Sequence, residues 1–147
     1  MAFDAFLRID GIEGESTDDA HKGEIDVVAF NWSVTRPKKK KELQPLVIYK
    51  RVDKATPQLS LVTCAGGSIA SARLDVVRVG GDERQSFYQL LLQNVVIVGL
   101  EIEGVADAES NVPSEKLSLA YGAITARYTI VGLDGKPQAT VEGSCFK

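Results

Sequence analysis

The sequence contains very few of the residues from which catalytic and metal sites are usually built. It has one histidine, two cysteines, one tryptophan and one methionine in 147 residues. Imidazole catalysis would have to use His21, which lies in a polar stretch between Asp19 and Lys22, so we expect a solvated loop residue there. A zinc site needs three or four cysteine, histidine or acidic ligands, and one histidine with two distant cysteines is too few. This scarcity argues against an enzyme and against a bound metal.

The sequence also has no long apolar segment, and we expect no N-terminal targeting peptide. Asp4 and Arg8 interrupt the opening residues, whereas a secretory signal needs a continuous apolar stretch. The most apolar segment, residues 90–100, contains Gln93 and Asn94, so it falls short of the roughly 18 uninterrupted apolar residues of a membrane span. We therefore expect a soluble chain that starts in the cytoplasm, where cysteines without metal spacing stay reduced.

Signatures of phosphate and nucleic-acid binding are weak. The glycine pairs at 66–67 and 80–81 lack the lysine of a Walker motif. Residues 80–83 read GGDE, the start of the diguanylate cyclase signature, but Arg84 follows and no alternating helix–strand pattern surrounds it, so we expect a hairpin turn. Lys38 to Lys41 have no interleaved aromatic residues, and the net charge is −3. We predict no cofactor, no nucleic-acid partner and no membrane insertion.

The size and composition are those of one globular domain with an uneven charge distribution. The chain is 44% apolar and 25% charged, and a domain of this size buries roughly two thirds of its unfolded surface. A basic run at Lys38–Lys41 follows Arg36, and an acidic run without a basic residue occupies residues 10–19. Each run can be a solvated loop, or the two can meet head to tail between copies. The acidic residues of that run are Asp10, Glu13, Glu15, Asp18 and Asp19.

Two-residue periodicity dominates the chain and predicts strands. In the first strand Ala5, Leu7 and Ile9 share one parity with Phe3, and Phe6 is an apolar exception on the other. The apolar phase then changes near Val27 and again around residue 122, as expected at a bulge or a face switch. Strands that change face serve a curved sheet or barrel. The pattern predicts a mainly β, barrel-like sandwich of two antiparallel sheets.

One short helix is expected to flank these sheets. Thr56 is the predicted N-cap, Pro57 the first helical residue, and the glycines at 66–67 the end. Leu59 and Val62 should face inward, with residues 64 and 65 as further candidates.

The pattern of the C-terminal half predicts long strands. Residues 87–103 also fit a helical stripe, but the β-branched run at 95–98 favours a strand, with bends at Asn94 and Gly99. The final strands, 117–131 and 138–146, flank a turn at 134–135. A protein with many strands has edges that must be protected or paired, so these features favour a binding or assembly module.

Three segments together resemble one known family. They are residues 5–16 (AFLRIDGIEGES), 49–59 (YKRVDKATPQL) and 117–122 (LSLAYG). Their order, spacing and total length are similar to those of the haemolysin-coregulated proteins (Hcp), which form the inner tube of the type VI secretion system. The resemblance runs essentially from end to end.

This resemblance implies a single tube domain over residues 1–147, assembled as a homohexameric ring around a wide channel. Rings would stack into a tube inside a contractile sheath, tipped by a spike protein and secreted without a signal peptide. The channel would carry effector proteins. Since the family has no active site to transfer, no catalytic, cofactor-binding or metal residue is assigned.

The segment 36–46 departs from the family pattern, because the corresponding loop in many relatives is longer and rich in small polar residues. We hypothesise that the lysines meet the acidic loop of the next ring, although a merely solvated loop is the alternative. Two alternative hypotheses for the function stay open: a monomeric β-barrel adaptor and a phage-like tail-tube subunit. The ring-stacking candidates are Lys38, Lys39, Lys40, Lys41, Glu13, Glu15, Asp18 and Asp19.

Overall fold

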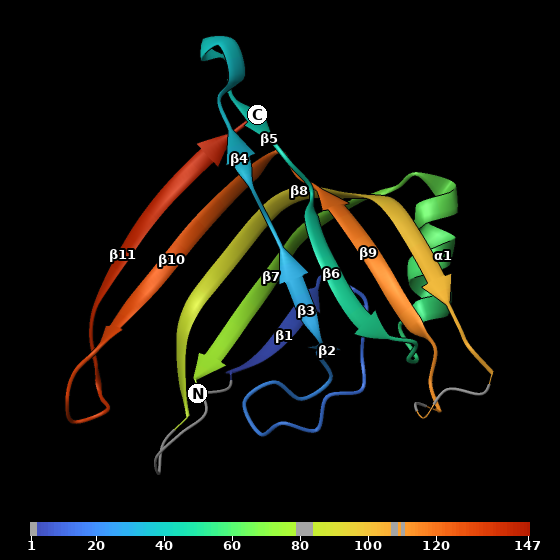
Figure 1. Cartoon of the computed structure of the whole chain (residues 1–147), viewed down its shortest axis with the longest axis horizontal. Coiled ribbons are helices and arrows are strands. Elements are labelled where there is room, and N and C mark those ends of the chain that lie inside the picture. The colour runs from blue at the N-terminus through green and yellow to red at the C-terminus, as the bar shows by residue number, and fades with distance from the viewer. Residues whose placement is uncertain (1–2, 79–83, 107–108, 110) are drawn as a thin grey trace.

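The computed structural model describes residues 3–78, 84–106, 109 and 111–147, so the turn expected at 80–82 lies outside the described residues. Within them the chain forms eleven strands, one α-helix and one short 3-10 helix (Figure 1). In chain order these are β1 (Phe3–Ile9), β2 (Ile25–Val27), β3 (Ala29–Asn31), β4 (Val34–Thr35), η1 (Pro37–Lys39), β5 (Glu42–Leu43), β6 (Leu46–Arg51), α1 (Thr56–Ala65), β7 (Ser68–Arg78), β8 (Gln85–Glu103), β9 (Ser114–Ala120), β10 (Ala123–Val131) and β11 (Pro137–Phe146).

Nine strands form one antiparallel sheet that curls into a barrel. The order of neighbours is β2-β1-β7-β8-β9-β6-β3, and β10 and β11 extend the sheet from β8. The first and last strands of this order are consecutive in the chain, separated only by Val28, whose N–H donates to the carbonyl of Tyr49 at 2.7 Å. The phase change predicted near Val27 is this break. The small β4–β5 pair is the second sheet, so the predicted mainly β, barrel-like fold of two antiparallel sheets is confirmed.

The long strand β8 turns a corner and takes part in two packed layers. Its first half pairs with β7 and β10, and its second half pairs with β9. Between them Asn94 has a left-handed φ of 54°, and the register with β9 shifts between Ile97 and Gly99, which confirms both predicted bends. The first layer contains β2, β1, β7, the first half of β8, β10 and β11. The second layer contains the second half of β8, β9, β6 and β3.

Residues 117–131, predicted as one strand, are two strands in different layers. The N–H of Gly122 donates to the carbonyl of Gln93 at 2.8 Å, next to the corner of β8, so the chain leaves β9 and re-enters as β10 at this point. The hairpin between β10 and β11 turns at 132–136 as predicted.

The helix begins and ends close to the predicted residues. Pro57 lies in its first turn, and Gly66 ends it with a left-handed φ of 74°. Thr56 is not the N-cap, however. It is already helical, and its hydroxyl accepts a hydrogen bond from the N–H of Asp53 at 3.0 Å.

The core lies between the two layers and beneath α1. Leu59 of the helix is fully buried and Val62 packs against the core, whereas residues 64 and 65 are exposed. Phe3, which shares the parity of the buried residues in β1, is 50% exposed because it lies at the strand's end. Each fully buried aliphatic side chain contributes about 1.5–3 kcal/mol. The core includes Leu7, Ile25, Leu46, Ile48, Leu74, Val95, Leu117 and Leu119.

Candidate assembly surfaces

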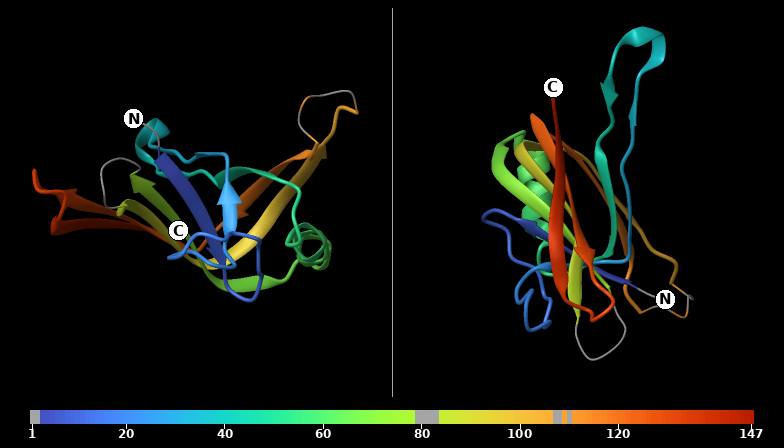
Figure 2. Two further views of the ribbon diagram at one scale, coloured as in Figure 1. Left: turned by 90° about the horizontal axis from the view of Figure 1, so that it is seen from below. Right: turned by 90° about the vertical axis from the view of Figure 1, so that its left-hand side faces the viewer.

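The two charged segments lie at opposite ends of the molecule. The acidic loop, residues 10–24, connects β1 and β2 near the lower end of Figure 1, and the lysine arm, residues 34–43, rises at the upper end. The right-hand view of Figure 2 shows the same separation. An end-to-end contact between copies therefore brings the arm of one towards the loop of the other.

The acidic loop folds back on itself and lies close to the barrel. The N–H of Gly14 donates to the carbonyl of Gly23 at 2.8 Å, and the N–H of Ser16 donates to that of Glu24 at 2.9 Å. A Cβ on Gly14 would lie 2.5 Å from the same Glu24 oxygen, so only glycine allows this approach. The loop is thus a fixed part of the fold.

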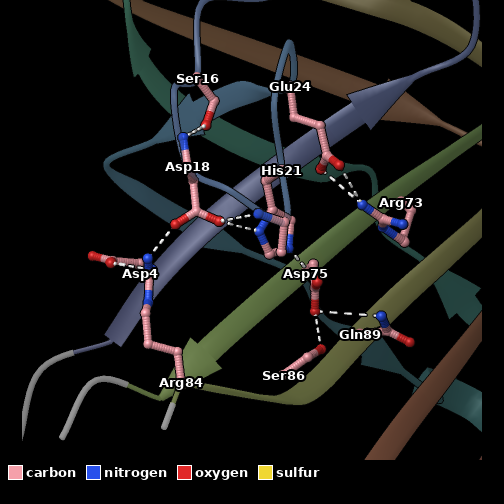
Figure 3. A network of polar contacts seen from close by, with 11 residues as sticks. Asp4, Ser16, Asp18, His21, Glu24, Arg73, Asp75, Arg84, Ser86 and Gln89 are labelled. Atoms are coloured by element: carbon pink, nitrogen blue, oxygen red, sulfur yellow. Dashed lines mark hydrogen bonds and ion pairs between the residues drawn. The ribbon is translucent and has the colours of Figure 1, made fainter. Parts of the chain in front are cut away.

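His21, expected to be solvated, is buried, so that expectation is wrong. Only 6% of its surface is exposed, and its ring stacks on Phe6 with the centroids 4.2 Å apart. Its Nδ1 lies 2.7 Å from Oδ2 of Asp18, and its Nε2 lies 2.6 Å from Oδ2 of Asp75 (Figure 3). The loop covers the outer face of β1, which is why Phe6 could be apolar there. That exception in the alternation was the sequence signal of this contact.

Both ring nitrogens of His21 face carboxylates, and this arrangement suits the cationic ring. Ionised carboxylates only accept hydrogen bonds, so each nitrogen must donate. Burial disfavours the charged ring, but the bonds to Asp75 and Asp18 outweigh it and raise the pKa of His21 above its usual 6.5. The hydrogen bond from His21, supported by Arg84, lowers the pKa of Asp18. We call His21, Asp18 and Asp75 the histidine clamp.

Neighbouring side chains hold the clamp in place. Asp75 of β7 also accepts hydrogen bonds from the hydroxyl of Ser86 and, at 3.3 Å, from the amide of Gln89 (Figure 3). Arg73, on the same strand, places Nη2 2.7 and 2.8 Å from the two carboxylate oxygens of Glu24 at the end of the loop. The loop is therefore tied to the sheet at His21 and at its end, Glu24.

Among the acidic stacking candidates, Asp18 is used within its own chain. Besides His21, its carboxylate contacts the guanidinium of Arg84, which also lies 2.6 Å from Asp4. With these partners Asp18 is poorly placed to bind a lysine of another copy.

The other three acidic candidates are exposed. Glu15 accepts a hydrogen bond from the backbone N–H of Lys54 at 2.9 Å, and Glu13 lies 3.5 Å from the ammonium of the same lysine. Asp19 is exposed, and no ion pair involves it among the described residues. Of the acidic stacking candidates, these three carboxylates are therefore the accessible ones.

The lysine arm contacts the barrel mainly at its base. There the indole of Trp32 donates to the hydroxyl of Tyr121 at 2.5 Å, and that hydroxyl donates to the carbonyl of Gln44 at 2.6 Å. Among the four lysine side chains, only that of Lys41 makes a hydrogen bond within the described chain, to the carbonyl of Phe146. The other three lysines are exposed on the projecting part, where they can reach another molecule.

A third surface is the β10–β11 hairpin, which projects from the barrel (left-hand view of Figure 2). The pairing of β10 with β8 stops at Tyr128, and beyond it β10 pairs with β11 alone. In the described part of the chain, β11 has no neighbour on its outer edge. Tyr128, Ile130 and Val141 are 43%, 40% and 58% exposed.

Sequence reasoning also missed a buried ion pair that is structural. Lys50 and Glu115 have fully buried side chains with Nζ and Oε2 3.0 Å apart, and Asp53 and Thr56 accept further hydrogen bonds from the ammonium. The cluster joins β6, β9 and the start of α1. Its four members saturate one another, so it offers no group for chemistry.

Among the described residues there is no metal-binding group, no helix that could span a membrane and no disulfide. Over residues 3–78, 84–106, 109 and 111–147, no three histidine, cysteine or acidic side chains gather closely enough to hold a metal ion. The same residues contain no helix that is long and apolar enough to span a membrane. Cys64 is exposed and Cys145 half-buried, and neither is in a disulfide.

Comparison with known proteins identifies the family of the chain. A family model described as "Type VI secretion system effector, Hcp" matches residues 6–128. The protein Hcp1 of Pseudomonas aeruginosa is 27% identical over 145 residues, which cover 92% of this chain and 88% of that protein.

Solved structures agree. Hcp1 from Salmonella typhimurium superposes with a TM-score of 0.85 at 27% identity, covering 99% of this chain and 95% of that one. A type VI secretion system effector from Yersinia pestis gives 0.82 at 25% identity, with 98% and 100% covered. From the family match and the shared fold together, we conclude that the chain belongs to the Hcp family of type VI secretion system proteins.

Proposed function

We propose that the chain is a structural tube subunit, six copies of which close into a ring. The observation that carries the ring is the outer edge of β11 (Pro137–Phe146), which pairs with no strand other than β10 among the described residues. An exposed edge of this length invites aggregation unless another chain covers it. A head-to-tail contact that repeats around an axis covers one such edge per copy and closes into a ring.

Stacking of these rings would use the two charged ends. The lysine arm of one ring would meet Glu13, Glu15 and Asp19 of the next, while Asp18 stays in the histidine clamp. Support comes from the opposite charges and opposite positions of the two segments. Since the carboxylates and lysines are exposed, their attraction is screened over about 8–10 Å in physiological salt.

The remaining roles follow from the family. The tube would lie in a contractile sheath beneath a spike protein, would carry effector proteins in its channel, and would be secreted from the cell. The subunit would act as a structural part and catalyse no reaction. Support comes from Hcp membership, which favours a secretion tube over a phage tail tube.

The test is the mass and shape of the purified protein, measured by light scattering on a sizing column and by negative-stain imaging. Six subunits of 15.9 kDa give about 95 kDa, and we expect six-fold rings. A stable monomer of 15.9 kDa over a range of concentration and salt would overturn the proposal and favour the monomeric adaptor.

A further inference from the structure

The two layers of the barrel are staggered relative to each other. On one side the first layer runs past the barrel as the β10–β11 hairpin, at the left of Figure 1. On the opposite side the second layer ends in the second half of β8, at the right of the same view. The left-hand view of Figure 2 shows both extensions pointing away from the body.

The hairpin extends the core-facing surface of the first layer into solvent. Ile124, Tyr128 and Ile130 share one face of β10 because side chains alternate. Ile124 is 1% exposed in the core, whereas Ile130 is 40% exposed. Val141 lies directly opposite Tyr128 in β11 and is 58% exposed. We call Tyr128, Ile130 and Val141 the hairpin strip.

The end of β8 presents a matching surface on the second layer. Leu100 and Ile102 oppose the buried Leu117 and Glu115 of β9, so they too face the core side. Leu100 is half-buried and Ile102 is 50% exposed. The pairing of β7 with β8 goes no further than residue 96, so in the described chain the outer edge of residues 99–103 has no strand partner. We call Leu100 and Ile102, with this edge, the β8 ledge.

We propose that the hairpin strip of one copy covers the β8 ledge of the next copy in the ring. The inference rests on the proposed ring and names its contact surfaces. The strip belongs to the first layer and the ledge to the second, on opposite sides of the molecule, and both expose the core-facing side of their layer. When copies lie side by side in the ring, the projecting first layer of one copy packs on the end of the second layer of its neighbour, where that neighbour has no first layer of its own. The sandwich then continues from copy to copy, and the edge at 99–103 is buried.

Cross-linking tests this contact directly. In a chain with Cys64→Ser and Cys145→Ser, the pair Ile130→Cys and Ile102→Cys should react with a short bis-maleimide. The expected product is a ladder of linked chains up to the hexamer under denaturing conditions. The matched control replaces Ile130→Cys by Thr129→Cys, which lies next to it on the opposite face of β10 and should give at least tenfold less product.

A charge on the strip provides the second test. Ile130→Asp should convert rings into monomers, whereas Thr129→Asp should leave rings intact, and circular dichroism checks that both fold. Suppose that the wild-type chain forms rings. Equal cross-linking of the Ile130→Cys and Thr129→Cys variants, or an Ile130→Asp variant that still forms rings, would then overturn the contact and leave the proposed ring standing. A wild-type chain that stays monomeric would overturn both.

Discussion

The acidic loop and the lysine arm are both short, charged segments in the sequence, and the fold treats them in opposite ways. The loop lies against the barrel through the histidine clamp, whereas the arm stands away from it. In the loop the left-handed residues are Gly11 and Gly23, with φ of 80° and 76°. In the arm they are Lys38 and Lys39, with φ of 51° and 65°, a conformation that costs about 1–2 kcal/mol for a residue with a side chain. The difference teaches that charge density alone does not reveal whether a segment is anchored.

Removing the clamp should produce the largest effect. His21→Ala leaves Asp75, whose side chain is 6% exposed, without its cationic partner. Breaking a buried pair of this kind costs about 3 kcal/mol in the free energy of unfolding, measured by urea denaturation. The matched change in the arm, Lys39→Ala, should stay within about 0.5 kcal/mol.

A second substitution checks the mechanism. Because the penalty comes from an uncompensated carboxylate, adding Asp75→Asn to His21→Ala should restore about 1 kcal/mol of the loss. Equal stability of His21→Ala and Lys39→Ala would show that the loop and the arm are equally unanchored.

The clamp should also make stability depend on pH. Because the pKa of His21 is raised in the folded state, its contribution is complete below the unfolded value of 6.5 and is lost as pH rises through the folded value. The pKa of Asp18 is lowered, so its contribution is present above 3.8 and is lost as pH falls through the folded value. The urea midpoint should fall on raising pH from neutrality, by less than His21→Ala causes. A His21→Gln variant with an unchanged slope would contradict this assignment.

Reversing the charge of the arm should affect assembly without affecting folding. With Lys38 to Lys41 all changed to glutamate, we expect fewer tubes at low salt, because each exposed pair contributes about 0.2–1 kcal/mol. Electron microscopy at low and high salt measures tube length, and the unfolding free energy serves as the control. Unchanged tubes at low salt would show that the arm is only solvated.

The smallest effect should come from the arm's backbone. Lys38→Gly relieves left-handed strain but adds freedom to the unfolded chain, and these terms of about 1 kcal/mol nearly cancel. Gly14→Ala in the acidic loop should cost more, since the new Cβ meets the backbone of Glu24 and Ile25. Urea midpoints of the two variants compare them, and equal shifts would remove the distinction between the segments.

Sequence alone could predict those features whose cause is local. The strand at 95–98 follows from β-branched side chains, the helix ends from Pro57 and Gly66, and the corner in β8 from residues 94 and 99. Three predictions failed where distant residues decide: the solvated His21, the N-cap at Thr56, and the single strand through Gly122, which bonds back to the corner of β8. The stacking candidates were found as charges, but their separation at two ends of the molecule was not.

By itself the sequence determined the mainly β fold, its curvature and the family, because alternation, glycine positions and recurring segments are written along the chain. Only the tertiary structure decided that His21 is buried between two carboxylates, because these partners come from different elements and Asp75 lies 54 residues away. The same holds for Lys50 and Glu115, and for the exposed strip on the hairpin. The alternation of residues shows which side of a strand is apolar. Only the position of the other layer decides where along the strand that apolar side becomes exposed to solvent.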